Sequence, residues 1–211
     1  MVFIVSLSIF IFFLNFIILW KFYYIKEERQ ERTFQILSNI MIISAFLISL
    51  FNSGFFRLFF KENISYFGQF WTWFLLLGIV FILIGLKLHS LAKKALNVKK
   101  FKNGKPILMK KGIFEITRHP LYLSWFFIFL GLTFVMDSFV ALIFCPILAI
   151  SIELLGSLEE KYILIPNYGK EYEKYKEKSP NRLISQPYNY LLIIIAILVI
   201  YIGFINLSEL F

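Results

Sequence analysis

Residues that could bind a charged ligand stand together at Arg118-His119, directly before an uncharged run that opens with Pro120. Proline favours the first turn of a helix, so we expect a helix to begin here. A helix N-terminus flanked by Arg and His attracts anions, because its free backbone N–H groups and both side chains converge on one point. The alternative is simple anchoring at a membrane interface, with Arg118 at the head groups and Tyr122 among the interfacial aromatics.

A second segment carries carboxylates and follows the next apolar run. Glu153 and Glu160 are seven residues apart, which places them on one face of a continuing helix. An unpaired carboxylate at the edge of a membrane is costly, so we expect Arg118 and His119 to lie nearby and compensate it. The same carboxylates could hold an ammonium or sulfonium group, and solvated charges at a helix end are the alternative.

A third segment is aromatic. Tyr168, Tyr172 and Tyr175 follow one another at intervals of four and three residues, which is the spacing of one stripe on an amphipathic helix. Such a helix either lies on the membrane surface or folds back as a lid whose rings stack on a base or face a cation. The spacing alone leaves both arrangements open.

The elements that must position these segments are long apolar runs. The chain has 211 residues, of which 59% are hydrophobic and 20% aromatic, whereas a soluble domain averages about 45–50% apolar residues. Six stretches lack charge, and their lengths predict an all-α, polytopic membrane protein with about six spans and a cytosolic amphipathic helix towards the C-terminus. We expect one membrane domain over residues 1–211. Its predicted spans are about 2–24, 34–58, 67–90, 120–136, 138–156 and 188–207, and the fourth and fifth form a tight hairpin.

The net charge of +9 follows the predicted topology. Of the 22 Lys and Arg residues, 20 fall in three alternate loops, 21–32, 87–118 and 161–182. The positive-inside rule places these loops in the cytoplasm and both termini outside. We therefore expect the lipid bilayer as the partner of the basic residues and no nucleic acid.

Several kinds of chemistry are excluded. The sequence has no G-x-G, no P-loop and no H-E-x-x-H motif, and its two histidines and one cysteine are too few for a disulfide or a rich metal site. We predict no metal. His89, near the inner end of the third predicted span, either points at a cofactor pocket or is a satisfied interfacial histidine, and we favour the second interpretation.

The order of the three segments resembles the integral-membrane methyltransferases of the isoprenylcysteine carboxyl methyltransferase and phospholipid methyltransferase superfamily. The resemblance covers roughly residues 78–185 and rests on Arg-His-Pro-x-Tyr before a hydrophobic hairpin, Glu-Glu after it, then Tyr-Gly-x-x-Tyr-x-x-Tyr and a proline. Two features depart from it. Ser124 stands where the family often has Gly, and a further apolar span, which could cover a lipid entrance or mediate oligomerisation, follows the motif.

The resemblance implies S-adenosylmethionine bound on the cytosolic side, within residues 112–182. It implies that Arg118, His119 and Glu160 take part in catalysis as well as in binding. The acceptor would be amphiphilic or small, such as a prenylcysteine carboxylate, a lipid amine or a thiol. An amine or thiol must lose a proton, and His119, Glu153 and Glu160 are the candidate bases. The implied cofactor-binding residues are Arg118, His119, Pro120, Tyr122, Glu159, Glu160, Tyr168, Tyr172 and Tyr175.

Two rival functions remain. Membrane reductases related to the steroid and sterol reductases share a similar element before a hairpin but use NADPH. They typically carry an acid two residues after the motif tyrosine, where this chain has Ser124. The other rival is a non-enzymatic membrane scaffold or carrier, which predicts no stoichiometric cofactor.

Overall fold

The computed structural model describes residues 2–22, 30–51, 70–97, 101–102, 105–184 and 201. Across these ranges the chain is helical apart from loops and one minimal antiparallel pair, β1 (Phe101–Lys102) and β2 (Lys105–Pro106). The predicted all-α fold class is confirmed.

Four helices are long and apolar enough to cross a membrane, and this confirms a polytopic helical membrane protein. The predicted last span, 188–207, lies outside the described residues except for Tyr201, and stays a prediction. The four long helices are α1 (Val2–Phe22), α2 (Gln30–Phe51), α4 (Trp71–Asn97) and α7 (Phe139–Glu159), and a shorter apolar helix is α6 (Pro120–Val135).

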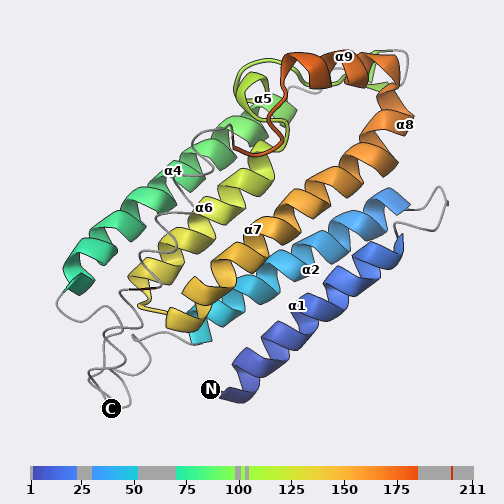
Figure 1. The fold of residues 1–211 in the computed structure, drawn as a ribbon. Helices are drawn as coiled ribbons and strands as arrows, with labels where there is room; N and C mark the ends of the chain where they lie inside the picture. The colour runs from blue at the N-terminus through green and yellow to red at the C-terminus, as the bar shows by residue number, and fades with distance from the viewer. Residues whose placement is uncertain are drawn as a thin grey trace.

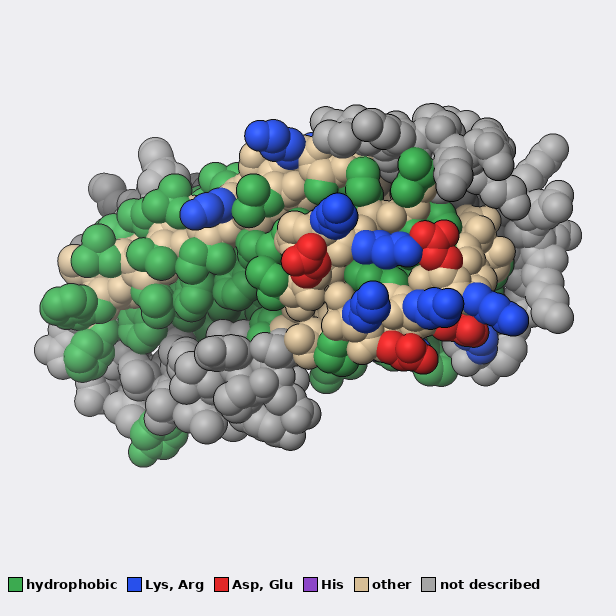
Figure 2. Space-filling model, turned by 90° about the horizontal axis from the view of Figure 1, so that it is seen from above, with side chains coloured by type: hydrophobic (Ala, Val, Ile, Leu, Met, Phe, Trp, Pro, Cys, Tyr) green, Lys and Arg blue, Asp and Glu red, His purple; other side chains and the backbone are tan. Residues whose placement is uncertain are grey.

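The long helices lie side by side, and a short helix, α9 (Lys170–Lys178), runs across one end of the bundle (Figure 1). The chain begins at the opposite end. Lys, Arg and Glu side chains gather on the end that carries α9, whereas hydrophobic side chains dominate the flank (Figure 2). We call the end with α9 the polar end.

Helices α6 and α7 form the expected hairpin. The turn between them uses Asp137, whose φ is +50°, a left-handed conformation that Asp adopts more readily than most residues. Ser138 then caps α7 by accepting a hydrogen bond from the backbone N–H of Ala141 at 3.4 Å. The hairpin therefore brings the start of α6 and the end of α7 together at the polar end.

Apolar side chains fill the space between α1, α2, α6 and α7. Phe129 of α6 and Ile152 of α7 are fully buried there, and Phe12 of α1 meets Phe144 of α7 edge to face at 4.7 Å between ring centroids. In contrast, α1 and α4 expose large apolar residues such as Phe3 and Trp73 on their outer sides. This distribution suits a bundle whose surroundings are themselves apolar.

Close backbone contact joins α4 to α6. A Cβ atom added to Gly78 would lie 2.7 Å from the carbonyl oxygen of Gly131, and one added to Gly131 would lie 2.5 Å from the carbonyl oxygen of Gly78. About two turns further along α4, a Cβ on Gly85 would lie 2.9 Å from the carbonyl oxygen of Ser124. Small residues at these positions let two membrane helices approach more closely than side chains would allow.

Candidate functional site

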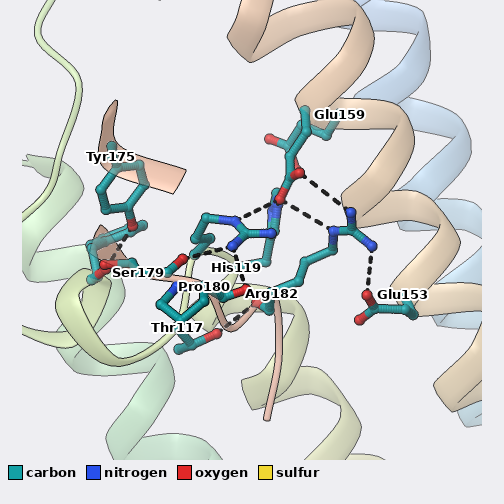
Figure 3. A network of polar contacts seen from close by, with 11 residues as sticks. Thr117, His119, Glu153, Glu159, Tyr175, Ser179, Pro180 and Arg182 are labelled. Carbon is teal, nitrogen blue, oxygen red and sulfur yellow. Dashed lines mark hydrogen bonds and ion pairs between the residues drawn. The ribbon is translucent and has the colours of Figure 1, made fainter. Parts of the chain in front are cut away.

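The site is built around Glu160, at the end of α7. Arg118 donates from Nε to Glu160 Oε1 at 2.9 Å, and His119 Nε2 lies 3.1 Å from the same oxygen. The side chains of all three residues are at most 5% exposed. The hairpin thus brings together two segments whose charged side chains would be costly to bury separately. Figure 3 shows the side chains of these segments converging.

His119 faces a second carboxylate with its other ring nitrogen, since Nδ1 lies 3.2 Å from Glu159 Oε2. A ring that meets carboxylates at both nitrogens must donate from both, so this histidine is an imidazolium. Burial alone would lower the pKa of His119, but its hydrogen bonds with Glu159 and Glu160 and their charges outweigh burial and raise it. The ring also stacks on Tyr122, with 5.5 Å between centroids and 17° between planes.

A π-helical turn begins at the second of the two glutamates that face His119. Residues Glu160–Leu164 form a π-helix in which the N–H of Ile165 donates to the carbonyl of Glu160. Pro166 follows within the short helix α8 (Ile165–Tyr168). Proline has no N–H to donate and its ring clashes with the carbonyl four residues earlier, and a wider turn relieves that clash.

Arg182 is the site residue that the sequence interpretation missed. Its Nε donates to Glu160 Oε1 at 3.2 Å, its Nη2 to Glu160 Oε2 at 3.4 Å, and its Nη1 to Glu153 Oε1 at 2.6 Å. These carboxylates hold the pKa of Arg182 above its usual value against the opposing effect of burial. From the sequence, Arg182 was interpreted only as one of the basic residues of a loop. Its position directly before the last apolar run could have indicated that it lies at the edge of the membrane.

Arg182 reaches the site because residues 179–182, which we call the strap, lie along residues 117–119. The backbone N–H of Arg118 donates to Asn181 at 3.1 Å, and that of His119 donates to Arg182 at 3.1 Å. Arg118 Nη1 also donates to the carbonyls of Ser179 and Pro180, at 2.6 Å each. The strap therefore ties α9 to the first turn of α6.

A glycine on α7 leaves room for this arrangement. A Cβ atom added to Gly156 would lie 2.9 Å from Arg182 Cδ and 3.2 Å from His119 Cδ2. Real Cβ atoms essentially never approach as closely as the first distance. Because Gly156 has no side chain, the side chains of Arg182 and His119 can pack directly against α7.

The tyrosine stripe faces the protein. Tyr172 and Tyr175 are buried against Phe114 of α5 (Ile113–Ile116), and Tyr175 donates to the carbonyl of Phe114 at 2.6 Å. Burial and the charge of Glu160 raise the pKa of Tyr175 to about 12, although Arg118 opposes them. The stripe therefore packs on the protein at Phe114, and its role as a lid over a ligand stays a prediction.

The spacing suggested that the three tyrosines share one helix, but the structure divides them between two. Tyr168 ends α8, and Gly169, whose φ is +51°, separates it from α9. Only Gly adopts this conformation without strain, so the chain turns between the first and second tyrosine of the stripe. Tyr168 nevertheless packs beside Tyr172 and Tyr175 at half burial.

Tyr172 has the most unusual environment of the three. Its side chain is 1% exposed, yet its hydroxyl has no partner in hydrogen-bond geometry. Burial and the charge of Glu160 hold its pKa far above the usual value, so the hydroxyl is neutral and keeps its proton.

The charges of the site balance. Arg118, His119 and Arg182 carry three positive charges, and Glu153, Glu159 and Glu160 carry three negative ones; we call these six side chains the ion cluster. Arg118, His119 and Glu160 are closed off from solvent, whereas the side chains of Arg182, Glu159 and Glu153 are 23%, 29% and 45% exposed. The outer three offer both signs of charge to a zwitterionic ligand.

The remaining predicted residues have different places. Pro120 begins α6 as expected, with His119 as its N-cap residue, so its part is to start the helix. His89 lies apart from the ion cluster and contacts Ser124 and Trp125. Of the residues named for the cofactor, the structure brings Arg118, His119, Glu159 and Glu160 into one cluster.

Comparison with known proteins gives one finding. Residues 71–171, from the start of α4 into α9, match the family described as phospholipid methyltransferase. No curated protein and no solved structure matches the chain. The match confirms the resemblance to the membrane methyltransferase superfamily and covers α4, the hairpin and both glutamates after it.

Proposed function

We propose that this membrane protein, whose residues 71–171 match the phospholipid methyltransferase family, is a methyltransferase that uses S-adenosylmethionine to methylate an amphiphilic acceptor at its polar end. A lipid amine suits the family description better than a prenylcysteine carboxylate or a small thiol. The ion cluster is the observation that carries the proposal. It unites cations, carboxylates and aromatic rings where α6, α7 and the strap meet.

The donor set fits the proposed cofactor. The cofactor has an α-carboxylate, an α-ammonium, a sulfonium and an adenine. Arg182 suits the carboxylate, Glu153 and Glu159 suit the two cationic groups, and all three are partly exposed. When bound, the cofactor supplies an electrophilic methyl group on sulfur.

The protein's own contribution would be positioning. Methyl transfer from a sulfonium is an in-line displacement, and correct approach geometry can contribute about 7–11 kcal/mol. Buried Arg118 and Glu160 hold the start of α6, the end of α7 and the strap in one arrangement. The buried tyrosines of α9 keep water away from that end.

His119 and Glu160 are poor bases in this arrangement. His119 already carries its second proton, since both ring nitrogens face carboxylates. Glu160 accepts from Arg118, His119 and Arg182, so no lone pair of Oε1 is left for an acceptor. We propose that both residues orient the cofactor, and that a proton leaving an amine acceptor goes elsewhere.

Isothermal titration calorimetry of the purified protein in nanodiscs tests the proposal. S-Adenosylmethionine should bind at a ratio of one to one, and NADPH should not. Arg182→Gln should weaken binding by roughly 10-fold or more, because a hydrogen bond to a charged group contributes about 1.5–3 kcal/mol. Lys110→Ala, which removes an exposed ion pair with Glu171, is the matched control and should bind like wild type.

Two outcomes would contradict the proposal. Binding of NADPH in place of S-adenosylmethionine would favour a reductase. Absence of any stoichiometric cofactor, together with unchanged heat stability on adding S-adenosylmethionine, would favour a scaffold or carrier. A labelled-methyl transfer assay on a lipid extract then identifies the acceptor, because the extractability of the label separates lipid, peptide and volatile products.

A further inference from the structure

A second polar group lies on α4 and α6, outside the ion cluster. His89 of α4 is half-buried, and its Nδ1 lies 3.2 Å from Ser124 Oγ of α6. Its ring meets Trp125 at 4.9 Å between centroids and 65° between planes. Ser124 and Trp125 follow Tyr122, the ring that stacks on His119, so both histidines contact the first two turns of α6.

The contacts of Ser124 determine which ring nitrogen of His89 carries the proton. A serine hydroxyl has one proton, and Ser124 donates it to the carbonyl of Leu121 at 2.6 Å. The hydroxyl oxygen can therefore only accept from His89, and Nδ1 must be the donor. In the neutral ring this leaves Nε2 with a free lone pair.

The two histidines of the chain thus differ in what they can do. His119 has both nitrogens occupied by Glu159 and Glu160 and holds its proton. His89 is oriented by Ser124 through one nitrogen and can accept a proton at the other. Among the side chains that the structure describes around α6, His89 is the imidazole suited to act as a base.

The surroundings of His89 indicate a ligand that arrives from the bilayer. It lies near the polar end of α4, whose outer side is exposed and apolar at residues such as Leu83 and Leu86. Trp125 adds an aromatic ring that attracts an amine cation.

We propose that His89 binds the amine of the methyl acceptor through Nε2 and takes its proton. The N–H bond of the ammonium breaks and the proton moves to Nε2. The freed electron pair on nitrogen forms the new bond to the methyl carbon, while the electrons of the broken carbon–sulfur bond stay on the sulfur of the sulfonium donor. Ser124 is a positioning residue in this step. The proposal rests on the proposed function.

Nitrogen-15 NMR of histidine-labelled protein in nanodiscs tests the binding step without any cofactor. The chain has two histidines, so His89→Gln assigns both. We expect an imidazolium signal from His119 and the signal of an Nδ1-protonated neutral ring from His89. Ethanolamine phospholipid should shift the Nε2 resonance of His89, and choline phospholipid, which has no N–H to donate, should not. Equal spectra in the two lipids would overturn the proposal.

Methyl transfer to ethanolamine phospholipid tests the proton step. His89→Gln should lower kcat/KM by about 10²–10⁴-fold at neutral pH, which is the usual range for a lost general base. It should also remove the limb of the pH profile that belongs to the imidazole. Ser124→Ala should reduce the rate less and move the pH profile, because the ring loses its orientation. Ser90→Ala, a neighbouring exposed side chain on α4, is the control and should behave like wild type.

Calorimetry separates failure of this inference from failure of the proposed function. If wild type binds S-adenosylmethionine and methylates the lipid while His89→Gln keeps the wild-type rate and pH profile, the role of His89 is wrong and the methyltransferase assignment stands. If ethanolamine phospholipid is not methylated although another acceptor is, the role of His89 is also wrong. If wild type binds no S-adenosylmethionine, the proposed function itself fails.

Discussion

Helix α6 makes two contacts of opposite character. At the polar end, where α6 begins, charges hold it to α7 and the strap, with Arg118 and His119 meeting Glu160. Towards α4 it is held by backbone contact, with Gly131 against Gly78. Both sides bring distant residues within a few ångströms, but one depends on charge balance and the other on the absence of side-chain atoms.

This difference explains how one helix supports two histidines with opposite proton affinity. On the charged side, carboxylates surround His119 and keep it protonated. On the side of α4, a serine hydroxyl and a tryptophan surround His89, and the described contacts bring no carboxylate to it. The protonation state of each ring thus follows from which neighbour α6 meets on that side.

The largest effect should come from Glu160→Gln, which breaks the charged side at its centre. Three cationic side chains would lose their shared carboxylate, and removing one partner of a buried ion pair costs about 3–5 kcal/mol. Thermal unfolding in detergent measures the loss. Glu153→Gln is the control, because this half-exposed carboxylate pairs with Arg182 alone among the described residues and should contribute at most about 1 kcal/mol. An equal loss of thermal stability in both variants would show that the buried position of Glu160 does not make its ion pairs stronger.

A smaller effect should follow from Gly131→Leu, which breaks the glycine side. Even the first added atom would lie 2.5 Å from the carbonyl of Gly78, so α4 must move away. Overpacking of this kind costs about 1–3 kcal/mol. Leu83→Ala, on the exposed side of α4, is the control and should leave the unfolding temperature almost unchanged. If the two variants unfold alike, α4 and α6 do not pack through their backbones.

The charged side should also respond to pH. The folded state holds the pKa of His119 above its ordinary value of 6.5, so the imidazolium contributes stability that is fully present below about pH 6.5 and is lost as pH rises through the folded pKa. The unfolding temperature of wild type should therefore fall relative to His119→Gln over that window. Parallel profiles for the two proteins would mean that His119 does not titrate with folding.

The smallest effect should come from Lys110→Ala. This side chain donates to Glu171 at 2.6 Å, and the two side chains are 38% and 54% exposed. Exposed ion pairs contribute about 0–1 kcal/mol because water screens them and two long side chains lose freedom. We expect a change in unfolding temperature within about 2 °C. A loss as large as that of Glu160→Gln would mean that burial is not what separates the two pairs.

Much of the site could be predicted because burial of charge has a cost. A glutamate at the edge of an apolar run requires a cation. The expected partners Arg118 and His119 meet Glu160, whereas Glu153, which they were also expected to compensate, pairs with Arg182. Arg182 escaped prediction because its partnership requires the strap, which brings residues 179–182 beside residues 117–119 through backbone hydrogen bonds. No local sequence pattern predicts a pairing between two segments that lie so far apart in the chain.

The tyrosines show a similar division. Their spacing predicted an apolar stripe, but Phe114 of α5 decided that the stripe faces inward, and Gly169 divided it between two helices. His89 is a sharper case. Its sequence position suggested a satisfied interfacial residue, and among the described residues the contact with Ser124, 35 positions away, satisfies one of its two nitrogens.

Hydropathy, proline and charge placement act over a few neighbouring residues, so the chain alone was enough to establish the apolar helices, the start of α6 at Pro120 and the hairpin. The partner of each charged side chain was determined only by tertiary packing, which brings α6, α7 and the strap together. A proton stays on a ring according to the groups within about 4 Å of it, and those groups come from segments that only packing brings together. Two histidines that look alike in the sequence therefore differ in chemistry once the chain has folded.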